Sequence, residues 1–148
     1  MSNAVVTEAS AELLKECDSG VKMAIKSLDD IAEYVSDERL SGIIADSRKK
    51  HQELKCEVEE KLKNIGEDEK EPGVAARGMA YVKTNVEMSL KDSEKAAADL
   101  ITDGCNMGIK TLVKCINKTQ DAEDDVKFIA GKLINVEEEL LAAVRPFL

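Results

Sequence analysis

Apolar side chains recur along most of this chain at alternating steps of three and four residues, which places them on one face of an α-helix. Four such stripes cover residues 14–35, 40–65, 97–116 and 126–147. Each stripe is long enough for a helix of about five turns or more. The pattern therefore predicts an all-α protein built from four long amphipathic helices.

Short polar segments predict where the chain turns. Ser36 and Asp37 have the form of a helix N-cap ahead of the second stripe. Residues 117–121 form the next turn, and Pro146 ends the last helix. Two long helices joined by so short a turn must run antiparallel, so we expect two helical hairpins.

The segment between the two predicted hairpins has a different composition. Residues 66–73 are charged and contain proline, which ends the second helix. A weaker apolar stripe at 74–90 predicts a short crossover helix, and Asp92 or Ser93 caps the third long helix. We therefore expect a single domain over residues 1–148, with a hairpin at 8–65, a crossover at 66–91 and a hairpin at 92–148.

The two predicted hairpins resemble each other in sequence. Residues 22–28 align with residues 106–112 at an offset of 84. After an insertion of two residues near the turn, His51 aligns with Glu137. Duplication of one hairpin explains this match, and so does the ordinary similarity of any two bundle helices. In either case each hairpin has an apolar face that is buried only against the other hairpin.

Composition and charge limit the class of protein further. Aromatic residues make up only 3% of the chain, fewer than strand-rich domains use, and the net charge of −9 argues against binding to nucleic acid or to an anionic membrane. No apolar run approaches the roughly 18 residues needed to span a bilayer, and the first ten residues lack the features of a secretory signal. The four cysteines have no CxxC spacing, so we expect free thiols in a reducing cytoplasm.

Two hairpins joined by a long crossover resemble the ferritin-like superfamily. More specifically, the chain resembles a small bacterial ferritin-like family of unknown function across nearly its whole length. The motifs that carry this resemblance are Cys17–Gly20, its echo Thr102–Cys105, and Arg77–Met79 in the crossover. The resemblance implies a ferritin-like antiparallel four-helix bundle of two repeated hairpins, with a short extra crossover helix.

The resemblance also implies where a metal site would lie. In that family the residue after each motif glycine is commonly a glutamate that projects into the bundle, but Val21 and Cys105 occupy those positions here. Ferritin-like di-iron proteins also use Glu-x-x-His pairs on the second and fourth helices. This chain has a single histidine, His51, and the residue three positions before it is Arg48. Measured against the family that the chain resembles, these departures imply a degenerate di-metal site.

One polar layer remains in the predicted core. His51 lies near the centre of the second stripe, and Glu137 lies on the flank of the fourth. Counted from the two turns, these residues are level with Cys17 and Asp18 on the first helix and with Cys105 on the third. Three interpretations stay open: a hydrogen-bonded pair of His51 with Glu137 or Asp18, a mononuclear metal site of imidazole, carboxylate and thiolate, and a redox-active thiol.

These features favour a non-enzymatic structural or protein-interaction role, and they leave enzyme activity open. The alternative is a divergent metal-binding, metal-storage or di-iron-type oxidase protein that uses the His51 layer. We expect no cofactor in the first case, and iron, zinc or manganese in the second. Self-association through a helical face is the expected kind of partnership, and Met79, Tyr81 and Met88 are candidate contact residues. Cys56 faces away from its stripe and is expected to be an exposed thiol without a role.

Overall fold

Long α-helices make up the computed structural model, which describes residues 3–67 and 93–148. No strand occurs within these ranges, so the all-α prediction is confirmed. The elements are α1 (Asn3–Ala32), α2 (Glu38–Asn64), α4 (Ser93–Lys118), α5 (Asp124–Val144) and a short 3-10 helix, η2 (Arg145–Phe147). The predicted helix at 74–90, with Met79, Tyr81 and Met88, lies outside the described residues.

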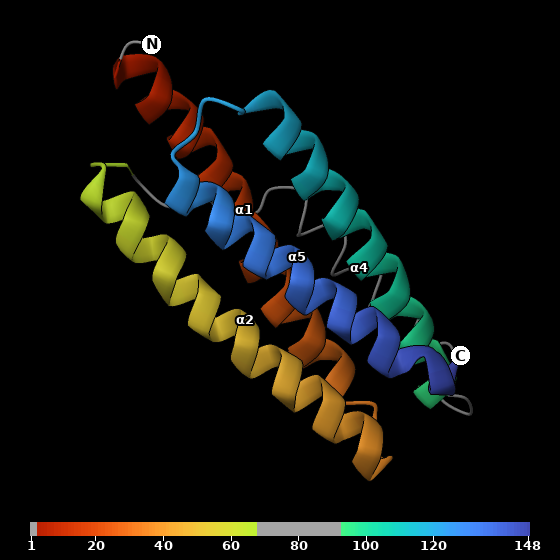
Figure 1. Ribbon diagram of the computed structural model, residues 1–148. Helices are drawn as coiled ribbons and strands as arrows, with labels where there is room; N and C mark the ends of the chain where they lie inside the picture. Colours follow the sequence, from red (N-terminus) through yellow and green to blue (C-terminus); the bar gives the residue numbers. More distant parts are fainter. Residues whose placement is uncertain (1–2, 68–92) are drawn as a thin grey trace.

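The four long helices pack side by side as a bundle (Figure 1). Helix α1 packs on α2 and α4 packs on α5, as expected for two hairpins, and the hairpins meet where α2 contacts α5 and α1 contacts α4. Lys61, near the end of α2, bonds to Asp125, near the start of α5, so these two helices run antiparallel. Lys118, at the end of α4, forms an ion pair with Glu12, in the first half of α1, so α1 and α4 also run antiparallel.

This arrangement makes α2 and α4 parallel, because both are antiparallel to α5. Helix α2 ends at the end of the bundle opposite to the one where α4 begins (Figure 1). No helix in the described part of the chain is both long and apolar enough to cross a membrane.

The polar turn between the first two helices ends as the sequence predicts. Asp37 is the N-cap of α2, and its Oδ1 accepts a hydrogen bond from the Leu40 amide at 2.8 Å. The Ser36 hydroxyl instead donates to Glu94 Oε1 on α4, at 3.2 Å. After α2, Gly66 has φ of 76°, a left-handed conformation that glycine adopts at low cost.

The turn between α4 and α5 lies two residues later than the expected 117–121. Helix α4 continues to Lys118 because Thr119 donates backbone and hydroxyl hydrogen bonds to the Cys115 carbonyl, at 3.0 and 2.7 Å. Glu123 is the N-cap of α5 but makes no capping bond with its side chain. Its amide donates to Ser10 Oγ on α1 at 2.9 Å, so a residue of the first helix caps the last one.

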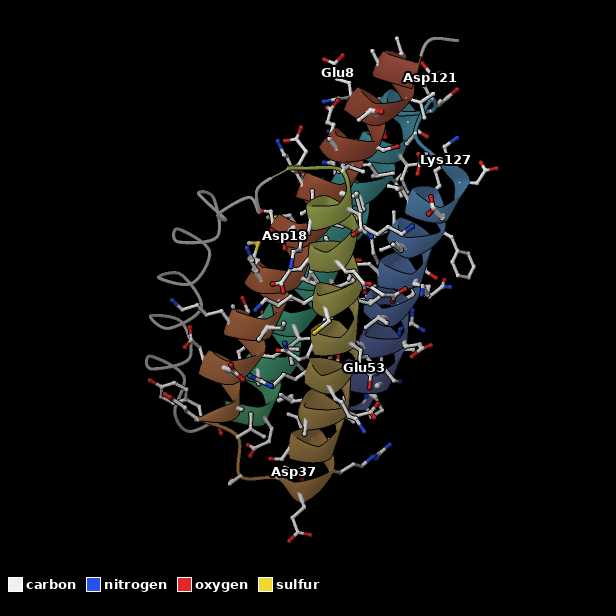
Figure 2. The ribbon with its side chains drawn as sticks, turned by 90° about the vertical axis from the view of Figure 1, so that its left-hand side faces the viewer. Glu8, Asp18, Asp37, Glu53, Asp121 and Lys127 are labelled. Atoms are coloured by element: carbon white, nitrogen blue, oxygen red, sulfur yellow. The ribbon has the colours of Figure 1, made fainter. Side chains whose placement is uncertain are left out.

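A polar layer divides the buried core into two apolar clusters. Ser47, His51 and Glu137 are buried at the level between them. One cluster lies toward the turn that contains Asp121 and the other toward Asp37 (Figure 2). Residues of the first cluster include Leu14, Cys17, Val58, Leu112, Cys115 and Leu133. Residues of the second include Leu28, Ile44, Ile101, Cys105, Leu140 and Val144.

Candidate functional site

His51 is the centre of the polar layer and is fully buried, with 0% exposure. Its position in the apolar stripe of α2 points the imidazole into the bundle. Nδ1 lies 2.8 Å from the backbone carbonyl oxygen of Ser47, one turn earlier, and 3.4 Å from the Ser47 hydroxyl. A carbonyl oxygen only accepts hydrogen bonds, so Nδ1 carries a hydrogen and donates it.

The second ring nitrogen meets a carboxylate from the other hairpin. His51 Nε2 lies 2.5 Å from Glu137 Oε1 on α5, and Glu137 is 7% exposed. Because Nδ1 already donates to Ser47, one proton has to lie between Nε2 and Oε1. The pair is either imidazolium with carboxylate or imidazole with carboxylic acid. Both forms have zero net charge, so the pair brings no net charge into the core.

Helix α4 supplies the remaining surroundings of Glu137. The Cys105 thiol hydrogen-bonds to the Glu137 carboxyl group, and its pKa is raised by burial first and by Glu137 second. Cys105 is therefore a protonated thiol that donates to an oxygen. One turn later, a Cβ placed on Gly108 would lie 3.6 Å from Glu137 Oε2, so α4 passes close to this oxygen.

The structure thus brings together three of the five residues that the sequence places in the layer: His51, Glu137 and Cys105. Cys17 instead belongs to the apolar cluster toward Asp121, next to Cys115. Burial, followed by the nearby Cys115, raises the pKa of Cys17 to about 12. A thiol that is buried among apolar side chains and has a raised pKa is an inert core thiol rather than a redox-active one.

Asp18, the fifth predicted residue, is buried on α1 (Figure 2). Its Oδ2 forms an ion pair of 2.9 Å with Lys22 Nζ, one turn along the same helix. The hydrogen-bonded partner of His51 is Glu137, which settles the choice that the sequence left between Glu137 and Asp18.

Two contributors to the layer were missed by sequence reasoning. Ser47 provides the carbonyl that fixes the imidazole tautomer, and Gly108 allows α4 to approach Glu137. The contribution of Ser47 comes from its backbone carbonyl, which every residue type has, so the serine itself gives no sequence signal for this role. Cys56 is exposed, as expected, and all four cysteines are free.

The distance between His51 Nε2 and Glu137 Oε1 is that of a hydrogen bond rather than that between two ligands of one metal ion. Nitrogen and oxygen ligands of a tetrahedral zinc ion lie about 3.3 Å apart, which exceeds the 2.5 Å between Nε2 and Oε1. Among residues 3–67 and 93–148, no group of three or more His, Cys, Asp and Glu side chains is placed so that it could hold a metal ion. A metal would have to displace the shared proton and separate the two side chains.

Comparisons of the chain with protein-family models, with curated proteins and with solved structures found no match.

Proposed function

We propose that this protein is a non-enzymatic helical bundle with a structural or protein-interaction role, and that its polar layer fixes how the two hairpins pack. The observation that carries the proposal is that the hydrogen bonding of His51 is complete within the core. Both ring nitrogens are engaged inside the core, one with Ser47 and one with Glu137. A buried polar pair of this kind favours a single register between helices, because any other register leaves its polar atoms without partners.

The helix directions support a ferritin-like layout as part of this proposal. Two antiparallel hairpins whose inner helices, α2 and α4, run parallel require one long crossover, which is the connection used in ferritin-like bundles. The contact between His51 and Glu137 joins positions that align under the proposed repeat. Val21 and Cys105, at the positions where the resembled family has carboxylates, are both buried, which supports a degenerate di-metal site.

A second candidate function, transition-metal binding, is favoured by one specific observation. The His51 Nδ1 hydrogen is donated to a backbone carbonyl, which is the outer contact that metal-ligating histidines usually make. Nε2 then points at a carboxylate that also contacts the Cys105 thiol. Nitrogen, oxygen and sulfur donors together suit zinc, and imidazole with carboxylate suits iron or manganese.

Metal analysis of protein purified without chelator separates the two functions. We expect less than stoichiometric metal, and no change in melting temperature on addition of iron, zinc or manganese. Stoichiometric metal that is lost in both His51→Ala and Glu137→Ala would replace the structural proposal by the metal-binding one. Arg48→Ala, which removes an exposed side chain on α2 that bonds Asp29, is the matched control for general perturbation of the helix.

The proposed location is the cytoplasm. All four cysteines are free, and three of them are buried, as is usual in a reducing compartment.

A further inference from the structure

The outer face of α4 has an ordered distribution of charge. Asp99, Asp103, Met107, Lys110 and Lys114 are all exposed, and Met107 is 59% exposed. At about 100° per residue these five side chains lie within an arc of roughly 80° on the helix. Acidic residues occupy the first half of this face and basic residues the second, with the methionine between them.

The opposite charges on this face cannot neutralise one another within one molecule. Asp103 and Lys110 are seven residues apart, or about 10.5 Å along the helix axis, whereas ion pairs on a helix join residues three or four positions apart. In the described part of the chain, neither of the two aspartates and neither of the two lysines forms an ion pair with another side chain.

The charges are instead placed symmetrically about the point between Asn106 and Met107. Asp103 and Lys110 lie at equal distances on either side of this point, and so do Asp99 and Lys114. When two copies of α4 cross antiparallel about a two-fold axis through it, each aspartate faces the matching lysine of the other copy. A parallel arrangement brings like charges together instead.

We propose that two copies of this protein associate through this face of α4 as a two-fold symmetric dimer. Asp103 pairs with Lys110 of the second copy, and Asp99 pairs with Lys114 of the second copy, so the axis generates four ion pairs. The two Met107 side chains meet near the axis and supply the apolar contact. This inference rests on the proposed interaction role and names its partner, a second copy of the chain.

A second copy fits this face better than an acidic or a basic partner of another kind. A uniformly charged partner would neutralise one half of the face and repel the other half. Two-fold dimers require a self-complementary patch, which is the property that the arrangement of charges has. At about 0.15 M ionic strength, the repulsion between two copies of net charge −9 is screened beyond roughly 8 Å, whereas contacting pairs are screened less.

Charge exchange tests the proposal. Sedimentation equilibrium of the full chain at about 0.15 M salt should show a monomer–dimer equilibrium. Asp103→Lys and Lys110→Asp should each weaken dimerisation by roughly tenfold or more, because each turns two attractions into two repulsions. The double variant carrying both substitutions should restore the wild-type dissociation constant, because the exchanged charges again face each other.

The matched controls make the same changes of charge on the outer face of α2. Glu53→Lys and Lys49→Asp change exposed residues that form no ion pair in the described structure, and Glu53 lies on the outside of α2 (Figure 2). Both should dimerise as the wild type does. A strict monomer at every concentration overturns the proposal. Dimerisation that ignores the changes at 103 and 110, or a double variant that fails to recover, also overturns it.

Disulfide trapping gives an independent geometric test. In a Cys56→Ser background, which removes the one exposed cysteine, Met107→Cys places a thiol next to the proposed axis. Mild oxidation should give a covalent dimer, whereas Lys49→Cys in the same background should give little. Equal trapping at the two sites overturns the assigned face. Neither experiment depends on metal content, so failure here leaves the test of the structural role intact.

Discussion

At the scale of single residues, the polar layer depends on His51 and Glu137 being present together. Each side chain is the hydrogen-bond partner of the other inside the core. Either one alone would be a buried polar group without that partner. The energetic question is therefore how strongly the two are coupled, which is separate from how much the pair stabilises the fold.

We predict a strong coupling between the two positions. His51→Leu or Glu137→Leu alone should lower the free energy of unfolding by about 3–5 kcal/mol, because the remaining group is buried and unpaired. The double variant should lie close to the wild type, because apolar side chains of similar volume replace a buried ion pair at little cost. Urea unfolding of the four proteins measures the coupling.

The control for this cycle is the neighbouring pair Lys50 and Glu139, on the same two helices. Its atoms are 3.0 Å apart but its side chains are 42% and 61% exposed, so leucine at either position should change stability by about 1 kcal/mol or less. If the losses of unfolding free energy in the two single variants simply add in the double variant, then His51 and Glu137 do not stabilise each other. Their pairing would then not explain the polar layer.

The buried thiols predict loss of stability at high pH. The pKa of Cys17 is raised from the ordinary 9.0 to about 12, mainly by burial, and that of Cys105 is raised for the same first reason. Below pH 9 the folded and the unfolded chain both keep these thiol protons, so the buried thiols make their full contribution to the free energy of unfolding. As pH rises above 9 the unfolded chain releases them while the folded chain keeps them, so the free energy of unfolding falls.

Urea unfolding between pH 8 and pH 10 should show this decline, and Cys17→Ala should show a shallower one. Val58→Ala removes apolar volume from the same cluster without removing a titrating group, so it should lose stability but keep the wild-type slope. An unchanged slope in Cys17→Ala would show that Cys17 ionises equally in both states.

Much of the residue-scale site follows from helical spacing alone. The stripes place His51, Glu137 and Cys105 at one level, and the structure brings these three together. Cys17 points into the core, but counting residues from the turns does not fix its level along the bundle, and it lies in the apolar cluster toward Asp121 rather than in the layer. The role of Ser47 belongs to its backbone carbonyl, which has no side-chain signal.

At the scale of helices, the bond between Ser10 and the start of α5 links the two hairpins. The Glu123 amide at the N-terminus of α5 has the Ser10 hydroxyl as its acceptor, and Ser10 is 1% exposed. Ser10→Ala should therefore destabilise the protein by about 1–2 kcal/mol, because the partly buried Glu123 amide loses its acceptor. Thermal unfolding followed by circular dichroism measures the loss.

Ser27→Ala is the matched control, since Ser27 also lies within α1 and alanine favours a helix at both positions. It should leave the melting temperature unchanged or raise it slightly. Equal effects at positions 10 and 27 would mean that the cap on α5 contributes nothing. This bond joins residues 113 positions apart, so no local sequence rule predicts it, whereas the cap at Asp37 is local and the sequence predicts it.

At the scale of the whole molecule, exposed and buried contacts between α2 and α5 agree on one register. Lys50 pairs with Glu139, Glu57 with Lys132 and Lys61 with Asp125, so positions that advance along α2 recede along α5. The hydrogen bond to Lys61 lowers the pKa of Asp125. Each exposed pair contributes little to stability alone.

At this scale the sequence predicts the two hairpins from their short turns. Only the alignment of His51 with Glu137 indicates how the hairpins dock against each other.

The division of the core by a polar layer has a consequence for how the bundle opens. An uninterrupted apolar core unfolds as one unit, but here the apolar contacts stop at Ser47, His51 and Glu137 and begin again beyond them. Partial opening of one end need not expose the other. Native-state amide exchange should therefore give two free energies of opening, the lower one for amides at the Asp37 end, where fewer of the described residues belong to the apolar cluster. One common value along all four helices would show that the layer joins the two ends into a single cooperative unit.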